Sequence, residues 1–308
     1  MVPRCCRGPY LMPDRKKRVR RSTPPAARKR RKRTAADLSV LIGFAPNPSR
    51  QFDSALATAL AGSPTNIDAT THFSVFCMPN LLPAGNQIAL GVLAQCEKDY
   101  TQLTKWFSID PCSIDPSLHF NVTLAGISKF LDGTGGATHK GCDSAEICCD
   151  VKLNPEVDAT VSSALLMAEA VEVFSAYQKL GWDCSASNGE GLSRVLAAGQ
   201  YPGVLTGGYL SAYAWLDGNR LNWVDNTDNT DVDGESTGCA VLFLNWMNTQ
   251  LGIGWDVICQ AGGSELAKMY KAVTGKNDGW QQFSALLNHA FPPTNPCGLK
   301  TDNPFPLT

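Results

Sequence analysis

The sequence contains no uninterrupted apolar run near the roughly 18 residues that a membrane-spanning helix needs, so no membrane span is predicted. It also lacks a phosphate-binding loop, a dinucleotide-binding glycine pattern and a G-x-S-x-G segment, which argues against the common nucleotide-binding enzymes and serine hydrolases. No two cysteines have C-x-x-C spacing, and no Cys/His cluster has zinc-finger spacing. Hydrophobic residues make up 44% of the 308, enough to bury the core of one large domain or two lobes. We therefore expect a globular monomer.

Charge is divided unequally along the chain. Residues 1–33 contain 14 Lys or Arg and one acidic residue, whereas residues 34–308 contain 13 basic and 27 acidic residues. The like charges of this segment repel one another, and it has few apolar residues to bury. Burial therefore does not compensate for the entropy lost on ordering, and residues 1–34 are predicted to be a disordered basic arm. Its two basic clusters resemble a bipartite nuclear-import signal or a nucleic-acid-binding arm. The alternatives are an over-long charged start of an export signal, or a start of translation at Met12 or later.

The number and spacing of the cysteines indicate the cellular compartment in which the protein is found. Ten of the 12 cysteines lie in the acidic body, an even number spread over its whole length. This predicts a disulfide framework and export to an oxidising compartment, and the sequon Asn121-Val122-Thr123 agrees with export. The alternative is a set of buried, reduced thiols that pack as small hydrophobic groups. We thus expect a secreted protein, with nuclear localisation as the alternative if the arm is an import signal.

Hydrophobic periodicity predicts an α+β fold, with a mixed sheet-and-helix half followed by a mainly helical half and a cleft between them. The pattern predicts strands at 72–78 and 120–127, an amphipathic helix at 86–107 and an edge strand at 146–153. Asp158 suits an N-cap. Helices are then predicted at 159–179, 190–200, 207–217, 236–251, 255–261, 264–274 and 280–290. The expected organisation is a basic arm (1–34), a linker (35–70), an α/β subdomain (71–157), a helical subdomain (158–292) and a C-terminal tail (293–308).

Two segments of the helical half carry a resemblance to a known family. The helix at 159–179 contains Ala168-Glu169-Ala170-Val171-Glu172, which resembles the H-E-x-x-H helix of zinc peptidases with both histidines replaced. Downstream, Ser187-Asn188-Gly189-Glu190-Gly191-Leu192-Ser193 resembles the N-E-G-L-[AS] segment of gluzincin-type metallopeptidases. The resemblance covers about residues 70–292 and extends to the plant basic secretory proteins. It implies a metallopeptidase-like fold.

The resemblance also implies roles for individual residues. Glu169 stands at the position of the general base and Glu190 at that of a glutamate zinc ligand. Ala168 and Glu172 stand at the two histidine positions, and alanine donates nothing to a metal, so this helix pair does not form a zinc site with three protein ligands. We therefore expect no zinc. The leading hypothesis is a secreted metallopeptidase-like protein that has lost zinc catalysis and binds a peptide or glycan in the former active-site cleft.

A second hypothesis keeps the activity. Glu169, Glu172 and Glu190 would form a carboxylate cluster that needs protons, a basic residue or a hard cation to offset its repulsion. Glu169 and Glu190 would then act as acid and base of a peptidase or glycosidase, or would hold Ca²⁺, Mg²⁺ or Mn²⁺ with a bound water. His139, on the predicted substrate-side edge of the sheet, would be a substitute ligand or acid. A third hypothesis, a nucleic-acid-binding protein, rests on the basic arm alone, because the acidic body repels phosphate.

The loop at 225–235 is the other dense acidic feature. Asn229-x-Asp231-x-Asp233-Gly234 matches the first half of a calcium-binding loop, with Asp228, Asp231 and Asp233 as candidate ligands. A complete EF-hand loop has a bidentate glutamate ligand at the position that Ala240 occupies here, so a complete EF-hand is excluded. Asx turns that cap the helix beginning near Ser236 are the alternative explanation. No cofactor is expected beyond calcium or another hard cation.

Overall fold

The computed structural model describes residues 62–109, 118–126, 136–139, 141–151, 155–205, 208–293 and 296–307. The described residues all lie in one compact unit, Gly43–Thr308. The predicted basic arm, most of the predicted linker and Cys112 lie outside the described residues.

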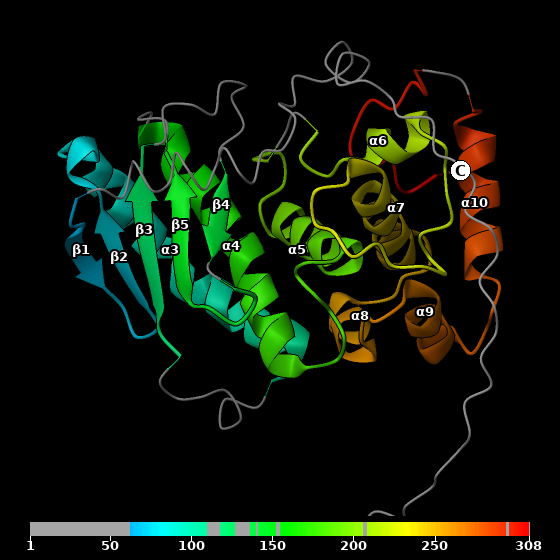
Figure 1. Ribbon diagram of the computed structural model, residues 1–308, viewed down its shortest axis with the longest axis horizontal. Coiled ribbons are helices and arrows are strands. Elements are labelled where there is room, and N and C mark those ends of the chain that lie inside the picture. Colours follow the sequence, from blue (N-terminus) through cyan, green and yellow to red (C-terminus); the bar gives the residue numbers. More distant parts are fainter. Residues whose placement is uncertain are drawn as a thin grey trace, which may run out of the picture. The chain divides into compact units, whose positions relative to one another are not determined.

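A five-stranded mixed sheet forms the first part of the described fold (Figure 1). Its strands are β1 (Thr65–Ala69), β2 (Phe73–Cys77), β3 (Phe120–Ala125), β4 (Ala137–His139) and β5 (Glu146–Asp150). Their order is β1-β2-β3-β5-β4, in which β2, β3 and β5 are parallel and the two outer strands are antiparallel to their neighbours. Side chains alternate between the two faces of a strand, and Phe73, Val75 and Cys77 of β2 are all buried.

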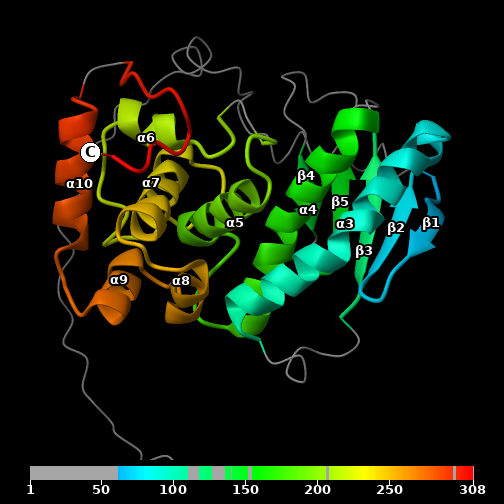
Figure 2. The same cartoon turned by 180° about the vertical axis from the view of Figure 1, so that it is seen from behind.

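Two long helices pack on this sheet, α3 (Ala84–Phe107) and α4 (Pro155–Gln178) (Figure 2). A short 3₁₀ helix, Pro79–Leu81, leads from β2 into α3. Helix α3 buries one stripe of residues at helical spacing, including Ile88, Val92 and Cys96. It contacts β1 and β2, whereas α4 contacts β4 and β5, so the two helices share the sheet between them.

Helix α4 is apolar almost all round. Residues Ala159–Gln178 form the one helix, among the described residues, that is long and apolar enough by composition to cross a membrane. The most apolar 18-residue stretch of this segment has a mean hydropathy of 1.3, and 72% of that stretch is buried inside the fold. Helix α4 contacts α3, α5 and the sheet there. A helix that is hydrophobic on every side is typical of a protein core. The core position of α4 therefore accounts for its composition.

The second part of the fold is helical. It contains α5 (Ser187–Gln200), α6 (Ala212–Asp217), α7 (Gly234–Asn245), a π-helix (Trp246–Gln250), α8 (Trp255–Ala261), α9 (Leu266–Thr274) and α10 (Gly279–Ala290). Helix α5 contacts α4 on one side and α7 on the other, and so joins the two parts (Figure 1). The core around α7 is aromatic, and the rings of Phe243 and Trp246 each contact those of Tyr270 and Phe283.

The predicted α+β class is confirmed, with corrections in detail. The predicted linker at 35–70 includes β1, a strand with mostly exposed side chains and no apolar alternation. The strand predicted as an edge at 146–153 is the interior strand β5, because β4 pairs with its outer side. Asp158 is not an N-cap, since α4 begins at Pro155, a residue favoured at the first helical position.

The helix predicted at 207–217 is shorter than expected. Gly208 has φ +89° and Ser211 has φ +56°, and such left-handed conformations do not occur inside an α-helix. Helix α6 therefore begins only at Ala212. The helix predicted at 236–251 is found as α7 followed by the π-helix.

Candidate functional site

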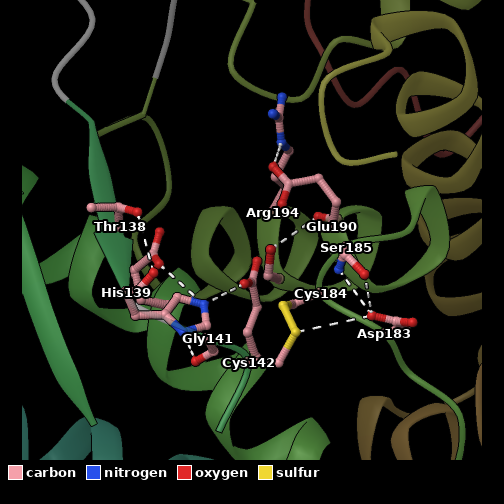
Figure 3. Close-up of polar contacts among 12 residues, drawn as sticks. Thr138, His139, Gly141, Cys142, Asp183, Cys184, Ser185, Glu190 and Arg194 are labelled. Atoms are coloured by element: carbon pink, nitrogen blue, oxygen red, sulfur yellow. Dashed lines mark hydrogen bonds and ion pairs between the residues drawn. A yellow bond between two sulfur atoms is a disulfide. The ribbon is translucent and has the colours of Figure 1, made fainter. Parts of the chain in front are cut away.

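The three glutamates singled out by the sequence lie together with His139. Glu169 and Glu172 are on α4, Glu190 is in the first turn of α5, and His139 ends the edge strand β4. Figure 3 shows His139 beside the residues it contacts, with Glu190 and Arg194 on the neighbouring helix. The site thus forms where the sheet edge meets α4 and α5.

Both ring nitrogens of His139 are held. Nδ1 donates a hydrogen bond to the carbonyl oxygen of Gly141, so this nitrogen carries a proton. Nε2 lies 2.8 Å from Glu172 Oε2 and 3.5 Å from Glu169 Oε2. The side chains of His139, Glu169 and Glu172 are 6%, 15% and 9% exposed. His139 therefore stands between two nearly buried carboxyl groups, with Nε2 free to exchange a proton with either.

Arg194 supplies the positive charge next to this group. Its Nε lies 2.6 Å from Glu190 Oε1, one helical turn away on α5. One of its terminal nitrogens donates to the carbonyl oxygen of Tyr209 (2.6 Å) and to Ser211 Oγ (2.9 Å). The guanidinium carbon also lies 5.5 Å from the centre of the Tyr209 ring. Glu190 is thus paired and oriented, while Glu169 and Glu172 face His139.

The site holds more acidic than basic groups, and this shifts their pKa values. Burial, followed by the charges of Glu172 and Glu190, raises the pKa of Glu169 well above its usual range. Burial and Glu190 raise the pKa of Glu172 to about 7, although His139 acts in the opposite direction. Burial disfavours the imidazolium of His139, but the hydrogen bond and charge of Glu172 outweigh it and raise the pKa. Near neutral pH the cluster therefore contains both a proton donor and a proton acceptor.

Two glycines place Glu190 at this point. A Cβ atom on Gly189 would lie 2.0 Å from the carbonyl oxygen of Asp183, and one on Gly191 would lie 2.7 Å from the Cβ of Ala240. Side chains at these positions would push the start of α5 away from the preceding loop and from α7. The Gly-Glu-Gly sequence thus lets α5 approach its neighbours closely enough for Glu190 to reach Glu172.

A disulfide borders the site. Cys142, in the turn between β4 and β5, is bonded to Cys184, in the loop between α4 and α5 (Figure 3). It ties the edge strand that carries His139 to the connection between the two glutamate-bearing helices. Of the described residues, the groups of three or more donors within 4.8 Å are His139, Glu172 and Cys184, and Cys142, Asp183 and Cys184.

The donor set does not fit zinc. Both of these groups need the sulfur of Cys184, which is bonded to Cys142 and is not a thiolate. A catalytic zinc takes three protein ligands, and without that sulfur only His139 and Glu172 remain in the first group. No catalytic step is therefore assigned to zinc.

The residues of the predicted calcium loop make several contacts within the fold. Asp233 caps α7, because its carboxylate accepts hydrogen bonds from the backbone of Glu235 (3.4 Å) and Ser236 (3.2 Å). The backbone of Asp228 pairs with Ser187 at the start of α5. Burial and the charge of Glu190 raise the pKa of Asp231. The capping alternative thus accounts for Asp233.

Several of the other cysteines do not take part in the disulfide framework that the sequence predicts. Cys77, Cys96, Cys239, Cys259 and Cys297 are buried and free. Burial raises the pKa of Cys77 and of Cys96 to about 11, so these thiols stay protonated and pack as small hydrophobic groups. The sequon residue Asn121 lies in the interior strand β3, where its side-chain nitrogen donates to Glu146 Oε1 at 2.6 Å.

Sequence reasoning missed Arg194 and its contacts with Tyr209 and Ser211. The spacing of Glu190 and Arg194 is that of an ion pair on one face of a helix, and this signal was available. Tyr209 and Ser211 reach Arg194 only through the course of the chain between α5 and α6, which no local pattern indicates.

Comparison with known proteins adds no assignment. No protein-family model matches the sequence, and neither the curated proteins nor the solved structures include a significant match.

Proposed function

We propose that the protein is a peptide hydrolase that uses the protons of His139, Glu172 and Glu169 in place of zinc. The position of His139 carries the proposal, with Nε2 2.8 Å from Glu172 and 3.5 Å from Glu169. Clusters of titratable groups with shifted pKa values are typical of catalytic centres. The protein would be secreted, and the Cys142–Cys184 disulfide supports this part of the proposal.

In the proposed reaction, the two carboxyl groups have complementary roles. Glu172, with His139, takes a proton from the attacking water, whose oxygen bonds to the carbonyl carbon of the substrate. Glu169, held protonated by its surroundings, donates its proton to the leaving nitrogen as the C–N bond breaks. The family resemblance placed Glu169 at the position of the base, whereas its raised pKa favours the role of acid.

His139 closes the proton cycle. After cleavage, the pair of Glu172 and His139 holds one extra proton, and Glu169 lacks one. Because Nε2 stands within 3.5 Å of Glu169, the ring can return the proton without a bulk-solvent step. The Nδ1 bond to Gly141 keeps the ring oriented during this transfer. One water molecule is consumed, two peptide products are released, and the enzyme returns to its starting protonation state.

Glu190 has a supporting role in this proposal. Its carboxylate is engaged by Arg194 at 2.6 Å, so it is less suited to proton transfer than Glu169 or Glu172. Its charge is among the causes that raise the pKa of both α4 glutamates. We therefore place Glu190 as a residue that tunes the acid and base, on a metallopeptidase-like framework with the substrate between the sheet edge and the helices.

A screen with fluorogenic peptide libraries, with nitrophenyl glycosides as a second arm, tests the proposal. Wild-type protein treated with a chelator is expected to cleave peptides, and Glu169→Gln is expected to lower kcat by about 10²- to 10⁴-fold. Glu97→Gln is the matched control, because Glu97 pairs with His72 at the same 2.8 Å near the opposite edge of the sheet. Turnover that Glu169→Gln leaves intact would contradict the proposal, and cleavage of glycosides alone would reassign the substrate. Binding of peptide or glycan without turnover would instead favour a protein that has lost catalysis.

A further inference from the structure

The Cys142–Cys184 disulfide lies against the acid–base site (Figure 3). The sulfur of Cys184, a ring nitrogen of His139 and a carboxylate oxygen of Glu172 all lie within 4.8 Å of one another. The sulfur of Cys142 is bonded to that of Cys184, so it is a fourth donor at the same point. Two sulfurs, one imidazole and one carboxylate therefore meet between β4, α4 and the loop before α5.

The state of the disulfide decides whether these donors bind a metal. Zinc is bound by thiolates, and a sulfur in a disulfide is not a thiolate. While the bond is closed, His139 and Glu172 are the two usable donors of the group. When it is open, two thiolates join them, and four nitrogen, oxygen and sulfur ligands are the set that tetrahedral zinc takes. A closed bond and a four-ligand zinc site thus exclude each other.

The hydrogen bonds of His139 are those of a metal ligand. Nδ1 donates to the carbonyl oxygen of Gly141, which also accepts from the backbone nitrogen of Ser144 at 2.7 Å. Nε2 faces Glu172 and the centre of the donor group. A histidine that binds a metal generally donates its other ring N–H to a carbonyl or carboxylate group, which fixes the ring. The turn after β4 therefore orients Nε2 for ligation.

The distances fit a zinc ion after small movements. With zinc–ligand bonds of about 2.0–2.3 Å, neighbouring ligand atoms are about 3–4 Å apart, so donors that lie within 4.8 Å need shifts on the order of 1 Å. Cys142 is in the same turn as His139 and stays near it when the bond opens. Cys142 and Cys184 are both partly exposed, so a reductant in solution reaches the disulfide.

The charge of the surroundings favours a cation. Glu169 lies 3.5 Å from His139 Nε2, and Glu190 acts electrostatically on both α4 glutamates. Arg194 pairs with Glu190 and balances one of these acids. A divalent cation next to Glu172 would offset the repulsion that remains.

We propose that reduction of this disulfide creates a zinc site, whose four ligands are Cys142, Cys184, His139 and Glu172. A dithiol reductant supplies two electrons and two protons: the S–S bond breaks, each sulfur takes up one proton, and the dithiol becomes a disulfide. Zn²⁺ then binds as the two thiol protons, and any proton on Glu172, pass to the solvent. The zinc ion replaces the disulfide as the link between the edge strand and the loop before α5.

Zinc and the proposed reaction would compete for the same atoms. The ion takes His139 Nε2 and the carboxylate of Glu172, which are the groups assigned to proton transfer. This consequence rests on the proposed function: reduced, zinc-loaded protein should be inactive, and oxidised protein active. The binding of zinc does not depend on hydrolysis. Zinc binding without any cleavage would support the site and contradict the hydrolase alone.

Metal titration of the full-length protein in two redox states tests the proposal. One sample is oxidised, and the other is reduced with a phosphine, desalted and kept under argon. Zn²⁺ affinity is measured by competition with a chromophoric chelator, and Co²⁺ reports thiolate ligation and tetrahedral geometry through its absorption bands. The loss of an outer partner of a zinc ligand typically costs about 10- to 100-fold in affinity, so the reduced protein should bind one Zn²⁺ at least about 100-fold more tightly.

Variants locate the binding. Cys142→Ser/Cys184→Ser should bind zinc no better than the oxidised wild type in either redox state, and His139→Gln should weaken binding to the reduced protein at least about tenfold. His72→Gln and Cys297→Ser remove an imidazole and a thiol elsewhere and should leave the affinity unchanged. Circular dichroism shows whether each variant is folded. No zinc uptake by the reduced wild type, equal affinity in both redox states, or thiolate–cobalt bands that persist in the double serine variant would each overturn the proposal.

Discussion

His139 Nε2 lies 2.8 Å from Glu172 Oε2, so an edge strand and the central core helix meet through one hydrogen bond. Helix α4 contains no histidine, so the helix alone offers no imidazole. The sheet edge supplies one from 33 residues earlier in the chain. The proposed proton transfer depends on this contact.

Replacing His139 should therefore remove the proton relay. His139→Gln keeps a polar side chain that hydrogen-bonds but does not titrate, and kcat is expected to fall about 10²- to 10⁴-fold. Because His139 lowers the pKa of Glu172, the substitution should also raise that pKa further. Steady-state kinetics and carboxyl-carbon NMR titration measure the two effects. His72→Gln is the control, and equal losses in both variants would contradict the relay.

The raised pKa of Glu172 predicts a pH dependence of stability. A carboxyl whose folded pKa is about 7, against 4.5 unfolded, binds more protons in the folded state, so its contribution is fully present below pH 4.5 and is lost as the pH rises to about 7. The loss is expected to reach about 3 kcal/mol. Glu172→Gln should remove this dependence, as measured by urea unfolding at pH 5 and pH 8. An identical pH dependence in wild type and variant would refute the assignment.

The ion pair on α5 should matter for stability as well as for the site. Arg194→Met leaves Glu190 without its partner and breaks the bonds to Tyr209 and Ser211. Removing one member of a fully buried pair costs about 3–5 kcal/mol, and we expect about 2–3 kcal/mol here because both side chains are partly exposed. The double variant Arg194→Met/Glu190→Gln should recover part of this loss in denaturant unfolding. A single variant as stable as wild type would show that the pair contributes little.

Two glycines of α5 give an internal comparison. Gly191→Ala places a Cβ 2.7 Å from that of Ala240 and should destabilise the protein by about 1–3 kcal/mol. Gly199→Ala meets no atom and should stabilise it by about 0.5–1 kcal/mol, because alanine is the better helix former. Thermal unfolding of the two variants measures both effects. The same sign of change at both positions would contradict the close packing of α5 on α7.

The Cys142–Cys184 disulfide should be stabilising. It closes a loop with a sequence separation of 42, and in the chain-entropy description a loop of this size contributes about 3–4 kcal/mol. Peptide mapping without reduction should yield the linked pair, and Cys142→Ser/Cys184→Ser should lower the free energy of unfolding by that amount. Recovery of both cysteines as free thiols would show that the bond is absent.

The regular elements were predictable where the apolar pattern was strong. Helix α8 has the predicted bounds, 255–261, and α3 begins two residues before its predicted start. The missed strand β1 lies at the sheet edge with exposed side chains, so it has no apolar alternation and is defined only by its pairing with β2. Helix α4 begins at Pro155, four residues before the start predicted from Asp158 as the N-cap.

The site was predictable in part. Glu169 and Glu172 are one helical turn apart, and a helix places such residues on one face. The approach of His139 depends on the pairing of β4 with β5, in which it faces Ile147, and no spacing in the sequence encodes that register. The pKa shifts likewise depend on burial by elements distant in sequence.

Metal analysis combined with turnover tests the central claim most directly. Purified protein should contain no stoichiometric zinc, and its peptide cleavage should persist in chelator and be lost in Glu169→Gln. One tightly held zinc per chain, or activity that chelator removes and zinc restores, would contradict a proton-based site.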